Sequence, residues 1–386
     1  MARTQGGAIP LFPRAFSPQN GAVHPTQLSY ALATHRDATN HEAPLGNPLM
    51  ALLQAVQDGG SIAAAATTLG LSYRHVWGQL KHWEQRLGHE LIHWERGQPA
   101  RLSELGQKVL RAERQAQARL APQIDTLRAE LDRSLAMAFG DSSPMLGLHA
   151  SHDDTLVLLR EHAANGARGG ARLHLDIHFC GSVDAIRDLS EGRCLVAGFH
   201  APSHAPADSH VARTYRPLLQ PDRHHLIGFS RRTQGLMVAP GNPLKLGSLA
   251  DVARTGARFA QRPLGSGTRA LLADLLDQAG LAPEQLHCGD TTEPCHAAVA
   301  QAVLSGLADA GLGPEPAARA RGLDFVPLVQ ENHFLACLTS ARDLPPVRAL
   351  CELLRSAAWQ RHLDAVPGCL HLRSGEVLNL KQALSW

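Results

Sequence analysis

Apolar residues recur every three or four positions between residues 73 and 88, the spacing of one buried face of an α-helix. They are Val76, Leu80, Trp83 and Leu87. Upstream, residues 61–69 contain four consecutive alanines, whose small side chains let another helix approach closely. Gly70 between the two segments suits the left-handed backbone of a tight turn. The pattern predicts two helices joined by a short turn, and an ordinary helical hairpin has the same pattern.

The opposite face of the second predicted helix carries groups that hydrogen-bond to bases and phosphates or leave room for them. Ser61 and Ser72 precede the two helices as N-caps. After Gly88, two short extended segments flank the turn Gly97-Gln98-Pro99, which indicates a wing. The candidate DNA contacts are Ser61, Ser72, Tyr73, Arg74, Gly78, Gln79, Lys81, Arg96 and Arg101.

Charge limits what one copy of this module can do. Residues 47 to 104 contain five basic side chains (Arg74, Lys81, Arg86, Arg96, Arg101) and five acidic ones (Asp58, Glu84, Glu90, Glu95, Glu104). A neutral module neutralises few phosphates, so a single copy should bind DNA weakly and with a shallow salt dependence. Two linked copies would compensate for this weakness.

A second helical stripe begins at Ser103 and offers the means of linking two copies. It comprises Leu105, Val109, Ala112, Ala116, Leu120, Ile124, Leu127, Leu131 and Leu135. At about 1.5 Å per residue such a helix is about 50 Å long, enough to hold two DNA-binding modules at separate half-sites. We expect a homodimer or homotetramer, with packing of the stripe against its own domain as the alternative. Pro122 lies inside the stripe and predicts a kink or a fresh helix start.

From about Ser142 the pattern changes to alternating strands and helices. Strands are expected at 144–149, 173–179, 194–199, 257–260, 308–312 and 325–329, and helices at 153–162, 183–189, 267–279 and 296–305. The βαβ order predicts parallel sheets in two lobes, with a ligand in the cleft between them.

The segment from Arg262 to Arg269 follows a predicted strand and opens a helix, so its amides, its two hydroxyls and the helix dipole converge where an anion fits. Across the cleft, residues 151–153 end another strand, where simple helix capping is the alternative. Ser182, Thr233, Thr292 and Glu293 fall at strand ends or hinges and rank second. The candidate ligand contacts are Ser151, His152, Asp153, Ser182, Thr233, Ser266, Gly267, Thr268, Arg269 and Thr292.

Composition bounds the remaining possibilities. The 386 residues are 44% hydrophobic, enough for two or three domains with cores. No run of about 18 apolar residues predicts a membrane span, and the first residues do not resemble a signal peptide. Seven scattered cysteines without a CxxC pair indicate a cytoplasmic protein, and 22 histidines without a recognised metal spacing predict no metal site.

A catalytic function is the other possibility to consider. His152 with Asp153 and Asp154, or Cys295 with His296, could suggest acid-base or thiol chemistry. Neighbours on one helix point in different directions and no third orienting group is identifiable, so we predict no catalytic residue and no enzyme.

Segments of this chain resemble two known families. Ser61, Ala65, Ala66, Leu69, Ser72, Gln79, Leu80, Glu84, Leu87, Gly88, Leu91 and residues 101–106 (RLSELG) resemble the LysR-type winged helix-turn-helix, and residues 71–77 (LSYRHVW) are similar to the ModE type of molybdate-responsive regulator. Residues 231–236 (RRTQGL), 240–243 (PGNP), 265–269 (GSGTR) and 305–313 (SGLADAGLG) resemble the periplasmic-binding-protein-like domain found with ModE-type modules and molybdopterin-biosynthesis proteins. Where such relatives often have threonine, this chain has Cys295 before His296, which puts a contact there in doubt.

The resemblance implies a transcriptional regulator with an N-terminal α winged helix-turn-helix, a long linker helix and a C-terminal α/β two-lobed periplasmic-binding-protein-like (type 2) domain. The expected boundaries are a flexible extension at 1–46, a DNA-binding domain at 47–102, a linker and dimerisation helix at 103–140 and an effector-binding domain at 141–386. The implied partners are operator DNA and an effector anion, molybdate or tungstate, with no other cofactor. The alternative is formate, another small carboxylate or a molybdenum-cofactor-related ligand, controlling a molybdenum-enzyme operon.

Overall fold

The computed structural model describes residues 47–95, 98–139, 143–165 and 173–386. The expected N-terminal extension at 1–46 and the candidate Arg96 therefore lie outside the described residues. No helix in these ranges is both long and apolar enough to span a membrane.

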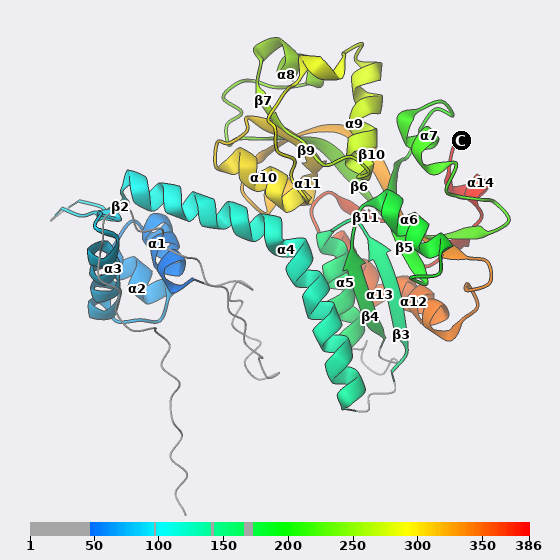
Figure 1. Cartoon of the computed structure of the whole chain (residues 1–386), viewed down its shortest axis with the longest axis horizontal. Helices are drawn as coiled ribbons and strands as arrows, with labels where there is room; N and C mark the ends of the chain where they lie inside the picture. Colours follow the sequence, from blue (N-terminus) through cyan, green and yellow to red (C-terminus); the bar gives the residue numbers. More distant parts are fainter. Residues whose placement is uncertain (1–46, 96–97, 140–142, 166–172) are drawn as a thin grey trace, which may run out of the picture. The chain divides into compact units, whose positions relative to one another are not determined.

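Three helices and a two-stranded antiparallel ribbon form the N-terminal module (Figure 1). They are α1 (Pro48–Gly59), α2 (Ile62–Thr68), α3 (Tyr73–Leu87), β1 (Ile92–His93) and β2 (Arg101–Leu102). Val76 and Leu80 of the predicted stripe are fully buried in its core. Gly70, with φ of 64°, makes the turn between α2 and α3, because a side chain is strained in that conformation.

One unbroken helix, α4 (Glu104–Ala138), follows the wing. The Oγ of Ser103 caps it by accepting from the amide of Gly106 at 3.0 Å. Of the two outcomes predicted at Pro122, a kink or a fresh helix start, the structure has the kink, because α4 continues through this residue and changes direction part-way along its length (Figure 1). A proline ring that displaces one turn of backbone accounts for such a bend.

The two faces of α4 have different surroundings. Gln115, Ala118 and Ala129 are buried, because this face packs against the C-terminal domain. Leu131 and Leu135 of the predicted stripe lie on the other side and remain 38% and 37% exposed. The own-domain alternative therefore does not account for this end of the stripe, whereas Leu105 at the other end packs against the core of the DNA-binding module.

The C-terminal domain is built on a mixed sheet of ten strands in the described residues, in the order β4-β3-β5-β10-β6-β9-β7-β8 with β11 and β12 beside β6. The strands are β3 (Met145–Ala150), β4 (His174–Phe179), β5 (Val196–Pro202), β6 (His224–Val238), β7 (Arg258–Ala260), β8 (His287–Cys288), β9 (Ala310–Pro314), β10 (Asp324–Leu338), β11 (Cys369–His371) and β12 (Val377–Leu378).

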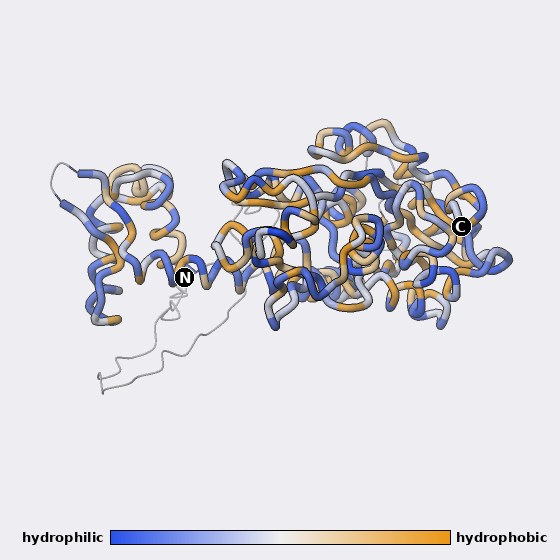
Figure 2. Tube along the Cα trace, turned by 90° about the horizontal axis from the view of Figure 1, so that it is seen from above, coloured by the Kyte–Doolittle hydropathy of each residue, from blue (hydrophilic) through white to orange (hydrophobic). Residues whose placement is uncertain are grey.

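Helices and one 3-10 turn, η1 (Pro283–Gln285), connect and cover these strands. The helices are α5 (Asp154–Asn165), α6 (Ser182–Ser190), α7 (His210–Tyr215), α8 (Leu249–Thr255), α9 (Gly267–Gln278), α10 (His296–Leu304), α11 (Glu315–Arg319), α12 (Pro345–Arg355), α13 (Ala357–Asp364) and α14 (Leu380–Ala383). Hydrophobic and hydrophilic residues alternate at short intervals along these elements (Figure 2), as expected where each element has a buried and an exposed side.

The parallel pairing predicted within each lobe is confirmed for β3 with β4 and β5 and for β7 with β8 and β9, but two 15-residue strands, β6 and β10, run antiparallel through the middle. Strands β3, β4 and β5 form the first lobe and pair onto β10. Strands β7, β8 and β9 form the second lobe and pair onto β6. The two long strands therefore connect the lobes, and polar residues 230–234 and 330–333 mark the crossing.

Candidate functional site

The outer face of α3 presents part of the candidate DNA-reading set. Tyr73, Arg74 and Gly78 are exposed. Within the described ranges no hydrogen bond or ion pair engages the Arg74 guanidinium. Ser72 caps the helix, with its Oγ accepting from the amide of His75 at 3.2 Å. This helix start thus places one unpaired cation where a phosphate or base edge could meet it.

Lys81 is tied into its own module. Its Nζ donates to the carboxylate of Glu84 at 2.7 Å and lies 4.9 Å from the ring centroid of Trp77. Glu84 is buried and also accepts from the amides of Leu91 and Ile92 at 2.9 and 3.2 Å. Burial alone would raise the pKa of Glu84, but Lys81 and the two amides lower the pKa overall. Sequence reasoning counted Glu84 only as a charge, whereas it anchors the wing to α3.

The remaining DNA candidates within the described residues differ in how accessible their side chains are. Ser61 caps α2 by accepting from the amide of Ala64 at 3.0 Å. Gln79 is half-buried, whereas Arg101 is exposed on β2. Of these, Arg101 has the accessibility that a phosphate contact needs.

The start of α9 forms one wall of the candidate anion site. Ser266 is its N-cap: the hydroxyl accepts from the amide of Arg269 at 3.3 Å and donates to the carbonyl of Pro263 at 2.9 Å. Gly267 and Thr268 are buried behind it. The hydroxyl of Ser266 is therefore engaged in capping, and the helix amides and Thr268 remain as anion donors.

Gly267 brings three elements to one point. A Cβ at this position would lie 2.8 Å from the hydroxyl of Tyr215 and 3.6 Å from the Oγ of Ser182. Both hydroxyls are fully buried and lack a hydrogen-bond partner in the described structure. Glycine is therefore required at the start of α9, because a side chain here would collide with the hydroxyl of Tyr215.

The segment after β3 forms the opposite wall. The Oγ of Ser151 is 3.5 Å from Nη2 of Arg262. His152 points to α4 instead, with its Nε2 3.0 Å from the carboxylate of Asp125. Asp153 accepts from the amide two residues further on at 2.8 Å, as a capping side chain does. Of these three candidates, Ser151 alone is brought to Arg262 by a hydrogen bond.

A buried ion network lies where β6 and β10 cross, and sequence reasoning missed it. The Nε of Arg232 donates to Glu331 at 2.6 Å, and its Nη1 donates to Asp153. Gln234 donates to the same Glu331 carboxylate at 2.8 Å. Burial opposes ionisation of Asp153, but the guanidinium of Arg232 and then His200 hold its pKa well below the usual range. The sequence did contain a signal for this network, because Arg232 lies within a stretch that otherwise has the residues of a buried strand.

Arg262 differs from Arg232 in having no carboxylate. It is 5% exposed, and its Nε and Nη1 have no partner in the described structure. Burial lowers the pKa of Arg262 to about 10, with Arg232 adding to this effect and Cys295 and Glu293 opposing it. A buried, unpaired guanidinium is unfavourable unless an anion joins it.

Other buried polar atoms without a partner gather in the same domain. They include the Nδ1 of His296, both ring nitrogens of His333 and the Oγ of Ser230. Burial holds the pKa of His296 and of His333 well below the usual range, so both imidazoles are neutral.

Three ligand candidates lie outside this set. The side chain of Arg269 lines a separate hollow of about 280 Å³ with Leu272 and Cys288. Thr292 is exposed. Thr233 is half-buried in β6, where its amide donates to the carbonyl of Gly368 at 3.3 Å. Arg269 was misplaced because the first turn of α9 directs its side chain away from the cleft.

Two groups of side chains have metal-ligating types within 4.8 Å of one another, His149–Cys180–Asp188 and Asp153–His200–His333. Both already have ionic partners, since His149 is 2.6 Å from Asp188 and Asp153 is paired with Arg232.

The chain is similar to known families in two segments. Residues 163–355 match the PBP superfamily domain, a segment of half the chain, and residues 49–107 match the bacterial regulatory helix-turn-helix protein, lysR family. The uncharacterized protein YvgK of Bacillus subtilis (strain 168) is 31% identical over 199 residues, 51% of this chain. The match spans 63% of YvgK, less than two thirds of its length.

Two solved structures also match most of this chain. The LysR family transcriptional regulator CbnR has a TM-score of 0.39 at 19% identity, covering 80% of this chain and 99% of its own. ArgP from Mycobacterium tuberculosis has a TM-score of 0.37 at 20% identity, covering 80% and 96%.

Proposed function

The chain belongs to the PBP superfamily and carries a lysR-family regulatory helix-turn-helix, and we propose that this LysR-type DNA-binding transcriptional regulator changes its binding to operator DNA when a small anion enters the cleft between its lobes. It acts by binding, without catalysis, in the compartment that contains the DNA.

The buried and unpaired Arg262 is the observation that supports an anionic effector. Molybdate or tungstate is the first candidate, because a tetrahedral oxyanion suits the hydroxyls of Ser151, Ser182 and Thr268 together with the amides that open α9. Formate or another small carboxylate is the alternative, since the planar guanidinium matches a planar carboxylate in two parallel hydrogen bonds. A molybdenum-cofactor-related ligand, with control of a molybdenum-enzyme operon, remains within the same proposal.

The regulator is proposed to act as a homodimer or homotetramer. Leu131 and Leu135 are 38% and 37% exposed along one side of α4. The matching stripe of a second copy would cover them. Two modules that are each neutral by count then share one operator, which raises affinity through linkage. Closure of the lobes around the anion would change how the paired α4 helices present the DNA-binding modules.

The test uses the full-length protein and a DNA fragment selected with it from a random pool. Affinity for DNA and thermal stability are measured without additive and with molybdate, tungstate, phosphate, sulfate or formate. One of these anions should raise the melting temperature and change DNA affinity, and Arg262→Met should remove both effects. The matched control is Arg254→Met, since Arg254 is exposed and lies outside the cleft. If no anion alters either quantity, the anion-sensor proposal fails.

A further inference from the structure

The long helix α4 contacts both lobes of the effector domain. On the second lobe, the guanidinium of Arg119 donates to both oxygens of Glu293 at 2.9 and 2.7 Å. On the first lobe, the Oγ1 of Thr126 accepts from the amide of Phe179 at 3.2 Å. Pro122 lies between these two sets of contacts. The helix therefore lies across the cleft as a third wall.

Further contacts keep this wall in place. The thiol of Cys295 donates to the carbonyl of Ala118 at 3.1 Å. Arg133 forms an ion pair with Asp176 of β4 at 2.7 Å. Cys295 thus takes part in holding α4, at the position where the sequence left a contact in doubt.

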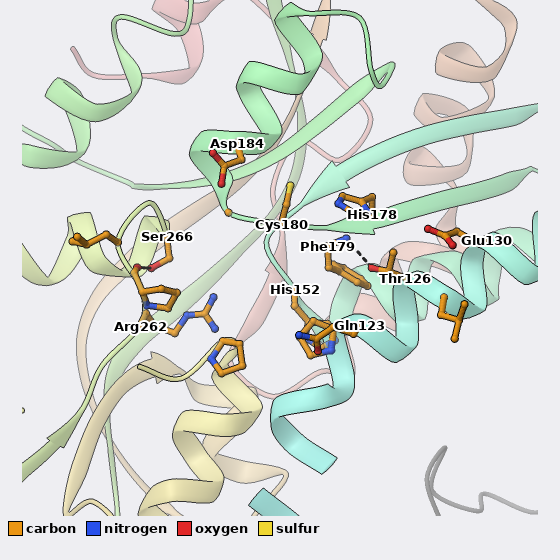
Figure 3. Close-up of a pocket in the computed structure, with 16 residues that line it drawn as sticks. Gln123, Thr126, Glu130, His152, His178, Phe179, Cys180, Asp184, Arg262 and Ser266 are labelled. Atoms are coloured by element: carbon orange, nitrogen blue, oxygen red, sulfur yellow. Dashed lines mark hydrogen bonds between the residues drawn. The ribbon is translucent and has the colours of Figure 1, made fainter. Parts of the chain in front are cut away.

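A cavity of about 490 Å³ lies between α4 and the two lobes (Figure 3). Arg262 and Ser266 lie on one side of it, and His178 and Glu130 lie on the other (Figure 3). The volume is in the range of pockets that hold small organic molecules, roughly 300–1,000 Å³. It greatly exceeds what formate or a tetrahedral oxyanion fills.

Part of the cavity lining is apolar. The apolar lining residues include Pro122, Leu127, Phe179, Pro263 and Leu264. Leu264 and Leu127 are 85% and 51% exposed, so both offer apolar surface to a ligand. A lining that combines apolar side chains with a few polar groups is typical of a site that orients one end of an organic ligand.

We propose that this cavity binds an organic anion, whose acidic group pairs with Arg262 and whose apolar body lies against α4. The inference rests on the anion-binding function proposed above and specifies its ligand class. Because the ligand body touches α4 itself, occupancy acts on the linker helix directly, in addition to any movement of the lobes.

The chain length of the anion tests the proposal. Calorimetric titration of the full-length protein compares formate, acetate, butyrate and hexanoate. Each methylene group that enters the cavity should tighten binding roughly fourfold, which corresponds to about 0.8 kcal/mol. Equal affinity for formate and hexanoate overturns the inference but leaves the anion-sensor proposal standing, whereas the absence of binding by every carboxylate and oxyanion overturns both.

Two variants on α4 separate this cavity from other apolar surfaces. Gln123→Trp introduces a large side chain at a lining position, and Asp132→Trp introduces the same side chain at an exposed position outside the lining. Gln123→Trp should weaken hexanoate at least tenfold and leave formate within about twofold, while Asp132→Trp should change neither. If both variants leave the hexanoate affinity unchanged, the ligand body lies elsewhere and the proposal is wrong. A loss of affinity for formate and hexanoate alike in Gln123→Trp also contradicts it.

Discussion

Replacing Arg262 by methionine should stabilise the ligand-free protein and remove its response to anions. The guanidinium is buried and its Nε and Nη1 have no partner in the described residues. Methionine has a similar length, is flexible enough to fill the space, and carries no charge to desolvate. The opposite signs of the two effects distinguish a ligand-binding arginine from a structural one, whose loss would destabilise the fold.

The size of the stabilisation expected for Arg262→Met follows from the pKa of Arg262. Burial lowers this pKa to about 10, and at about 1.4 kcal/mol per pKa unit the burial of the charge costs roughly 3 kcal/mol at most. Because the pKa of this cation is lower in the folded state, the cost is fully present below about pH 10 and fades only as the pH rises above that value. Relief of 1–3 kcal/mol corresponds to a rise of roughly 2–10 °C in the melting temperature.

The assay is thermal unfolding of the full-length protein at pH 7.5, with and without the effective anion. At a hundred times its Kd, an anion should stabilise the unmodified protein by about 2.7 kcal/mol, and Arg262→Met by nothing measurable. Arg254→Met should shift the ligand-free transition by less than about 1 kcal/mol, since it removes an exposed pair. A lower melting temperature for Arg262→Met, or a retained anion response, refutes the reasoning.

Four further predictions concern other parts of the chain. Arg74→Ala should weaken operator binding by about 1–3 kcal/mol in fluorescence anisotropy, and unchanged affinity would remove Arg74 from the DNA-reading set. Glu84→Ala should destabilise the DNA-binding module by about 2–4 kcal/mol, because two buried wing amides lose their acceptor. Since the pKa of Glu84 is lowered in the fold, the stability it contributes should be present above about pH 4.5 and disappear below that as the pH falls, as seen by circular dichroism. Leu131→Glu should shift the oligomer toward monomer in analytical ultracentrifugation, and an unchanged mass would exclude this part of α4 from the interface. Glu293→Gln, which weakens the contact with Arg119, should leave anion affinity within about threefold but reduce the effect of the anion on DNA binding; an undiminished effect would show that this contact carries no coupling.

The DNA-binding module was the part most accessible to sequence reasoning. The stripe containing Val76 and Leu80, the caps at Ser61 and Ser72 and the turn at Gly70 act between residues close in sequence. The local pattern therefore contains most of the information. The strands and helices near the start of each lobe were predicted for the same reason.

The strand β6 was not predicted, because residues 230–234 are polar and interrupt the apolar run. These side chains are acceptable in a buried strand only because residues about a hundred positions away supply Glu331 and Asn332 as partners. No local window can show this compensation.

The sequence by itself determined the elements of the DNA-binding module, those near the start of each lobe, the order of the domains and the loop that starts α9, since hydrophobic period, caps and glycine positions are local properties of the chain. Only the tertiary structure decided which polar groups face one another. In the folded chain Arg232 pairs with two carboxylates and Arg262 pairs with none, and α4 packs against both lobes. The free energy of a buried charge depends on what surrounds it, and that environment comes from distant segments brought together by folding.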